Sequence, residues 1–217
     1  MRIHEGHLPH WRQAGVLYFI TGRLADSMPQ EKLRQWQDER DIWLRVHGGT
    51  SLAGLDSLPE RKRHEFHSRF TQQWHRWLDA GYGECVLRLP HIRKIFVEKL
   101  MEHDGGRYAL DAWVIMPNHF HALVTPTTAA LGDVVQGWKG GSAFAINKAL
   151  GRSGSLWQKE PFDHIVRSED QWRHYQRYIA ENPLKAKLPP GDYAAGIGKV
   201  VSASAEILRE QLEQYEH

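Results

Sequence analysis

One segment, residues 113–124, limits most strongly what this chain can fold into. It reads WVIMPNHFHALV, and the apolar and β-branched residues on either side of a Pro-Asn pair predict two strands joined by a tight turn. His119 and His121 lie two residues apart in the second strand. Because side chains alternate between the faces of a strand, both imidazoles should point to the same face. The pair therefore indicates either a metal site, since imidazole is a frequent metal ligand, or two hydrogen-bonded histidines on a half-solvated strand.

The length and charge of the chain set bounds on its class. A chain of 217 residues, of which 41% are hydrophobic and 25% charged, can form one domain with a substantial core. The formal net charge is only +2, so a nucleic-acid site would have to be a local basic patch. The single cysteine, Cys85, excludes an internal disulfide and is typical of a reducing compartment. No apolar run approaches membrane-spanning length, so we expect a cytoplasmic protein that does not bind membranes.

The remaining segments predict an α+β fold. In chain order, the hydrophobic periodicity predicts strand 14–24, helices 29–47, 59–78 and 90–103, strands 107–116 and 118–124, helix 131–150, irregular strand 156–166 and helix 168–182. Long helices alternating with few strands indicate helices packed on one face of an antiparallel sheet. The chain divides into an N-terminal arm (1–13), one domain (14–188) and a peripheral C-terminal tail (189–217) with a polar helix at 205–214.

The last helix of the predicted domain carries a second group of candidate residues. Tyr178 and Asn182 are four residues apart and therefore share one face of the helix. A tyrosine can be a covalent nucleophile, and an amide oxygen can bind a divalent metal. Tyr175 lies three residues before Tyr178 on an adjacent part of the same face, and the spacing leaves both tyrosines as candidates.

Several of these motifs together resemble one family. Residues 113–121 resemble the strand motif of the HUH single-tyrosine transposases, and residues 178–188 resemble their Tyr-Ile-x-x-Asn-Pro helix. Residues 138–140 and 157–167 resemble the intervening segments of one branch, the REP-associated tyrosine transposases. The resemblance covers residues 14–188, with the motifs in the same order. It implies a ferredoxin-like sheet and a nuclease that depends on Mg²⁺ or Mn²⁺ and acts on single-stranded or hairpin DNA.

The resemblance also assigns roles to residues of this chain. It implies that His119, His121 and Asn182 bind the metal, and that Tyr178 is the nucleophile. The distance along the helix favours the same tyrosine. Tyr178 lies ~6 Å from Asn182 along the helix axis, against ~10 Å for Tyr175.

Basic residues are concentrated in the second half of the predicted domain. Residues 136–188 contain nine lysines and arginines against five acidic residues, an excess of four (9 − 5) in a chain whose total is +2. Cations near the site would bind DNA phosphates. The residues expected to do so are Lys139, Lys148, Arg152, Lys159, Arg167, Arg177 and Lys185.

These observations favour an enzyme over two alternatives. The expected activity is a metal-dependent cleavage and rejoining of DNA at REP hairpins through a 5′-phosphotyrosine intermediate. A catalytically silent binding protein for structured single-stranded DNA is the alternative. A His-ligated hydrolase of small substrates is a third possibility, but the acidic ligands and general base that it would need are missing from the motif. The sequence is compatible with either a monomer or a homodimer.

Overall fold

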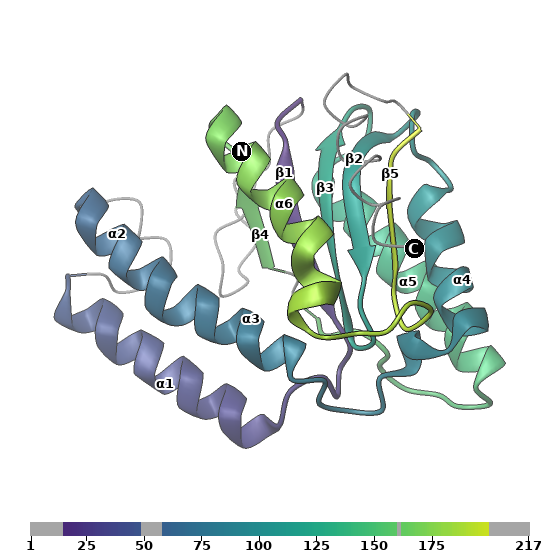
Figure 1. Cartoon of the computed structure of the whole chain (residues 1–217), viewed down its shortest axis with the longest axis horizontal. Helices are drawn as coiled ribbons and strands as arrows, with labels where there is room; N and C mark the ends of the chain where they lie inside the picture. Colours follow the sequence, from purple (N-terminus) through teal and green to yellow (C-terminus); the bar gives the residue numbers. More distant parts are fainter. Residues whose placement is uncertain (1–14, 49–57, 160–161, 200–217) are drawn as a thin grey trace. The chain divides into compact units, whose positions relative to one another are not determined.

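The computed structural model describes residues 15–48, 58–159 and 162–199 (Figure 1). Of these, residues 26–83 form one compact unit, the helical unit, and residues 15–25 and 84–199 form a second, the sheet unit. The predicted domain 14–188 therefore contains parts of two compact units. The predicted arm 1–13 and the predicted helix 205–214 lie outside the described residues.

The sheet unit has the strand and helix order of a ferredoxin-like fold, followed by one more helix and strand. Its elements are β1 (Tyr18–Arg23), η3 (Val86–Arg88), α4 (Pro90–Met101), β2 (Tyr108–Ile115), β3 (His119–Pro126), α5 (Leu131–Ala149), β4 (Phe162–Ile165), α6 (Glu169–Lys185) and β5 (Ala194–Ile197). All paired strands are antiparallel, in the order β4-β1-β3-β2-β5. The predicted α+β class and antiparallel sheet are confirmed. Strand β1 pairs with β3 on one side and with β4 on the other, and it is buried at all six positions.

Helices cover both faces of this sheet. Apolar residues of α4 and α5, among them Phe96 and Trp138, pack with Phe120 on one face. On the other face, Ile179 and Ala180 of α6 pack against Phe19 and its neighbours, and Figure 1 shows α6 opposite α4 and α5. The expected packing on one face therefore holds for α4 and α5 but is wrong for α6. The reason is that the central strands are apolar on both sides and need a cover on each.

A β-bulge in β2 reverses the alternation of its side chains. The pairing with β3 shifts between Leu110 and Ala112, which leaves Asp111 as an extra residue. Leu110 packs in the core under α4 and α5, whereas Ala112 packs in the core under α6. Asp111 accepts hydrogen bonds from two side chains of α6, from Trp172 Nε1 at 2.6 Å and from Gln176 Nε2 at 3.0 Å. The bulge thus provides the polar attachment of α6 to the sheet.

Two boundaries near the C-terminus differ from the predictions. The tail expected to be peripheral from residue 189 contributes β5, which pairs with β2. A Cβ atom added at Gly196 would lie 2.6 Å from the Trp113 ring, so only a glycine allows β5 to approach the sheet this closely. Helix α6 continues to Lys185 and includes the buried Pro183, which was expected just beyond its end. The missing N–H of a proline costs one helical hydrogen bond, and the helix continues past it to Lys185.

The helical unit is a second, smaller core made of α1 (Gln30–Val46), α2 (Glu60–Phe66), the π-helical turn η2 (His67–Thr71) and α3 (Gln72–Asp79). The predicted helix 59–78 is thus interrupted by η2. The buried apolar residues of this core are Trp43, Leu44, Leu58, Phe66 and Phe70.

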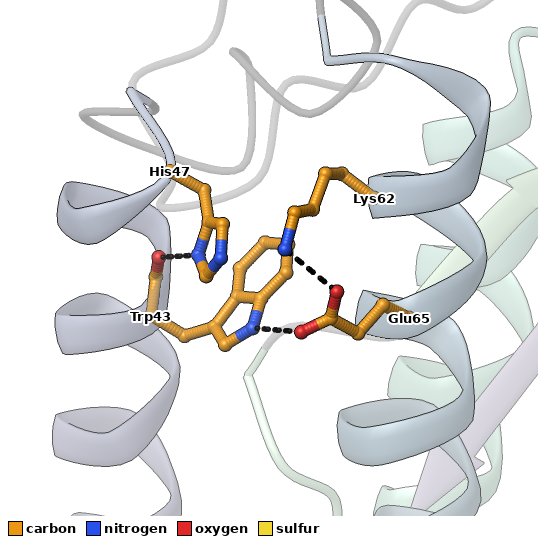
Figure 2. Close-up of polar contacts among 4 residues, drawn as sticks. All are labelled: Trp43, His47, Lys62 and Glu65. Atoms are coloured by element: carbon orange, nitrogen blue, oxygen red, sulfur yellow. Dashed lines mark hydrogen bonds and ion pairs between the residues drawn. The ribbon is translucent and has the colours of Figure 1, made fainter.

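A polar cluster joins α1 to α2 within the helical unit (Figure 2). Trp43 Nε1 donates to Glu65 Oε1 at 3.2 Å, and Lys62 Nζ donates to Glu65 Oε2 at 2.8 Å. The His47 ring stacks on Trp43 with centroids 4.1 Å apart. Hydrogen bonds from Lys62 and Trp43 lower the pKa of the Glu65 carboxyl. These contacts connect two largely polar helices, α1 and α2, at their surface.

None of the helices in the described ranges is long and apolar enough to cross a membrane.

Candidate functional site

The two histidines of β3 lie on the face of the sheet that α6 covers. His119 and His121 are 1% and 0% exposed, and their ring centroids are 4.9 Å apart. His121 also stacks against Phe19, a residue of the core under α6. The predicted same-face arrangement is confirmed. It results from the regular pairing of β3 with both β1 and β2, which keeps the alternation of side chains intact at this point.

Helix α6 brings Tyr178 to this histidine pair. Its hydroxyl oxygen lies 3.4 Å from Nε2 of His121, and the two rings meet edge to face with centroids 5.1 Å apart. Asn182, one turn further along α6, is 1% exposed, and neither its amide oxygen nor its amide nitrogen has a hydrogen-bond partner among the described residues. A buried amide without a partner is destabilising. The Asn182 amide is therefore better suited to binding a ligand than to stabilising the fold.

Two polar neighbours hold the imidazole rings by their Nδ1 atoms. Asn118 Oδ1 lies 2.7 Å from Nδ1 of His119. Since an amide oxygen only accepts hydrogen bonds, Nδ1 of His119 is the donor in this contact. Thr21 Oγ1 lies 2.7 Å from Nδ1 of His121. Contacts of this kind orient histidines that bind metals through Nε2.

The competing tyrosine has a different environment. The Tyr175 ring lies flat on Phe19, with centroids 4.1 Å apart and planes 14° apart. Burial raises the pKa of the Tyr175 hydroxyl to about 12, which disfavours the phenolate needed for attack. Phe19 contacts both Tyr175 and His121. The two tyrosines therefore differ in their relation to the histidine: Tyr175 packs on Phe19, whereas the Tyr178 hydroxyl contacts the His121 imidazole directly.

A charged residue that the motifs did not point to also lies on this face. Arg23 pairs with His119 in the register of β1 and β3, as Thr21 pairs with His121. Arg23 is 8% exposed, and burial lowers the pKa of its guanidinium to about 10, so it stays charged at neutral pH. The signal available in the sequence was the alternation of Phe19, Thr21 and Arg23, which puts two polar side chains on one face of an apolar strand.

The basic residues predicted to bind DNA occupy varied environments. Lys139 Nζ donates to the backbone oxygens of Gln158 and Lys159, so it fastens the segment that precedes β4. Arg152 forms an ion pair with Glu84. Lys185 pairs with Glu181 at 2.9 Å, and its ammonium lies 5.8 Å from the Tyr178 ring centroid. The remaining members are exposed, namely Lys148, Lys159, Arg167 and Arg177. A role in DNA binding stays a prediction for all seven.

The described residues contain no group of three or more His, Cys, Asp or Glu side chains that could hold a metal ion. A divalent ion bound by His119 and His121 would therefore need another kind of third protein ligand. The buried amide oxygen of Asn182 is such a donor, because Mg²⁺ and Mn²⁺ accept amide oxygens as well as carboxylates. The donor set fits a divalent metal on these grounds.

Comparison with known proteins confirms the sequence resemblance. The chain is 28% identical over 81 residues to a REP-associated tyrosine transposase of Escherichia coli, a match that covers 36% of this chain and 46% of that protein. It is 24% identical over 98 residues to an uncharacterized protein of Haemophilus influenzae, covering 35% of this chain and 54% of that protein. The chain thus spans about half the length of the curated relatives that it matches. No protein-family model matches it.

One solved structure is similar over most of the chain. It is a REP-associated tyrosine transposase bound to a REP hairpin, and the match covers 94% of this chain and 96% of that one. The TM-score is 0.41 and the sequence identity 18%.

Proposed function

We propose that this chain is an HUH single-tyrosine transposase of the REP-associated kind, which cleaves and rejoins single-stranded DNA. The observation that carries the proposal is the contact between the Tyr178 hydroxyl and the histidine pair, 3.4 Å from His121 Nε2. Tyr178 of α6 and His121 of β3 are 57 positions apart in the sequence. Their contact puts a candidate nucleophile beside a candidate metal ligand. The named E. coli relative supports the same activity.

The residues that would hold the metal are His119, His121 and Asn182. The fit rests on the Nδ1 contact of His119, which orients its ring, and on the buried amide of Asn182 that has no partner among the described residues. Bound Mg²⁺ or Mn²⁺ would neutralise the charge that develops on the phosphate oxygens during attack. Strand β3 would supply the two histidines and helix α6 the asparagine, already held by the fold, which reduces the ordering needed when the ion binds.

The chain's own contribution to the reaction is the nucleophile. The Tyr178 oxygen would form a bond to the scissile phosphorus while the bond from phosphorus to the 3′ oxygen breaks. The phenol releases its proton to solvent, and the 3′ oxygen takes one up. The products are a 5′-phosphotyrosine and a free 3′-hydroxyl, so the bond energy is kept and rejoining needs no nucleotide cofactor. The substrate class is hairpin or single-stranded DNA of the REP type.

Formation of the covalent adduct tests the proposal. A labelled hairpin oligonucleotide with single-stranded flanks is incubated with the full chain and Mn²⁺ or Mg²⁺, and the adduct is measured by denaturing gel electrophoresis. We expect an adduct that EDTA prevents and that Tyr178→Phe abolishes, while hairpin binding persists. Tyr175→Phe is the matched control and should still form the adduct. Hairpin binding without an adduct under any metal condition would instead indicate a silent DNA-binding protein.

A further inference from the structure

The α6 face of the sheet contains one group that the proposed reaction has not yet used, the buried guanidinium of Arg23. We propose that Arg23 binds a non-bridging oxygen of the scissile phosphate next to the metal site. This inference deepens the proposed function and rests on it for the identity of the substrate.

The strand register places Arg23 beside the histidine pair. Arg23 is the partner of His119 across β1 and β3, and Thr21 is the partner of His121. Side chains directly opposite in an antiparallel pair lie on the same face, with Cβ atoms about 4.5–5.5 Å apart. The guanidinium is therefore anchored next to His119, on the side of the sheet where the Tyr178 hydroxyl contacts His121.

The backbone around Arg23 is fixed on both sides. The Arg23 carbonyl accepts a hydrogen bond from the Gln158 N–H at 2.9 Å, and the Leu24 N–H donates to the Asn118 carbonyl at 2.9 Å. The preceding residue, Gly22, has no room for a side chain, because an added Cβ would lie 2.1 Å from the Phe120 ring. β1 can therefore lie tightly over Phe120 on one face and present Arg23 on the other. A phosphate-binding group held in this way needs little ordering when substrate arrives.

The chemistry of the Arg23 side chain suits a phosphate at this position. Arg23 lies opposite His119, a predicted metal ligand. A planar guanidinium matches the geometry of phosphate oxygens, and its low exposure strengthens the attraction. Such a cation would stabilise the charge that accumulates on the phosphorane-like transition state.

The test compares four forms of the full chain: wild type, Arg23→Met, Arg23→Lys and Arg173→Met. Methionine keeps much of the volume but not the charge, and lysine keeps the charge but not the planar fork. Arg173 is an exposed residue of α6 that pairs with Glu169, so Arg173→Met is the matched control. With Mn²⁺ and the hairpin oligonucleotide, we expect Arg23→Met to slow adduct formation about 100-fold, Arg23→Lys to slow it less, and Arg173→Met to leave it unchanged.

A second readout separates phosphate contact from a loss of structure. In the Tyr178→Phe background, affinity is measured for oligonucleotides that carry one neutral methylphosphonate at successive positions. Arg23→Met should weaken binding of the native oligonucleotide about tenfold, and it should cause no further loss when the methylphosphonate replaces the contacted phosphate. An equal loss on every oligonucleotide, or no loss on any, would overturn the Arg23 contact. If Arg23→Met does not fold, the same two measurements on Arg23→Gln, which also removes the charge, decide.

Failure of the proposed function has a different signature. If the wild-type chain binds the oligonucleotides but never forms an adduct, the transposase activity is overturned, and the methylphosphonate series still decides whether Arg23 contacts a phosphate. If the wild type forms the adduct and Arg23→Met forms it at the same rate, the activity stands and the role of Arg23 is overturned.

Discussion

At the scale of single residues, the amide of Asn182 is the most informative group in the candidate site. It is buried and both of its polar atoms lack a partner among the described residues, which costs about 1–3 kcal/mol relative to a satisfied or apolar group. Asn182→Leu should therefore raise the free energy of unfolding in EDTA by about 1–3 kcal/mol and weaken Mn²⁺ binding. Thermal unfolding with EDTA and titration calorimetry with Mn²⁺ measure the two effects.

The control for this substitution is Asn147→Leu. The Asn147 amide does have partners, since it donates to the Gly154 carbonyl at 2.9 Å and accepts from Arg152 at 3.3 Å. Its replacement should lower stability and leave Mn²⁺ affinity unchanged. A loss of stability for Asn182→Leu in EDTA would show that its amide is satisfied in the folded chain and would remove one of the two grounds for the metal site.

Asn118 is a second residue-scale test, because it acts through His119 rather than on the metal. Its Oδ1 fixes the proton on Nδ1 of His119, and the loss of such a contact weakens metal binding about 10–100-fold in comparable sites. Asn118→Ala should therefore reduce Mn²⁺ affinity by this factor in a calorimetric titration. Asn118→Asp keeps an acceptor and should bind Mn²⁺ at least as tightly as wild type. Equal affinities for the alanine and aspartate variants would rule out this role.

At the scale of elements, the bulge in β2 makes the attachment of α6 dependent on pH. Burial raises the pKa of the Asp111 carboxyl above 3.8, although hydrogen bonds from Trp172 and Gln176 act in the opposite direction. At pH values between the ordinary pKa of an aspartate and the raised pKa of Asp111 in the folded chain, the folded state binds more protons than the unfolded state. The free energy of unfolding therefore falls as the pH rises through this window, and the contribution is fully present only at more acidic pH.

Asp111→Asn removes this titration while keeping an oxygen acceptor for α6. Its stability relative to wild type should increase as the pH rises from about 4 through the raised pKa of Asp111. Urea unfolding of both proteins at several pH values measures the difference, with Asp133→Asn, an exposed aspartate of α5, as a control for the substitution itself. Parallel stability profiles for wild type and Asp111→Asn would contradict the argument.

At the scale of the whole molecule, affinity for DNA should depend on salt through a limited set of exposed cations. With a net charge of only +2, the chain has no strong overall field, and each phosphate contact should add about 0.7–0.9 to the slope of log K against log salt. Arg177→Met should lower this slope by one contact, because Arg177 is an exposed cation of α6, the helix that carries Tyr178. Lys139→Met should leave the slope unchanged, because Lys139 Nζ donates to backbone carbonyls.

Binding isotherms at several salt concentrations measure both slopes. A slope near zero for the wild-type chain would mean that phosphate contacts do not drive binding. A reduced slope for Lys139→Met, with the fold verified by circular dichroism, would restore Lys139 to the DNA-binding residues that the sequence predicted.

Local regularities allowed the sequence alone to determine part of the geometry of the candidate site. The period of two in a strand placed His119 and His121 on one face, and the turn of a helix placed Tyr178 near Asn182. The α+β class followed in the same way from the alternation of periodic segments. Each of these inferences needs only residues that are close in the chain, because local backbone geometry fixes their relative positions.

Only the tertiary structure decided the rest, because it depends on which distant segments pair. Tyr178 reached the histidine pair because α6 packed on the side opposite α4 and α5. This required both faces of the central strands to be covered. The position of Arg23 beside His119 depends on the register of β1 with β3. The attachment of α6 by Asp111 depends on a bulge that reverses the alternation of β2. Register and bulges are properties of a pair of strands, and neither strand specifies them alone.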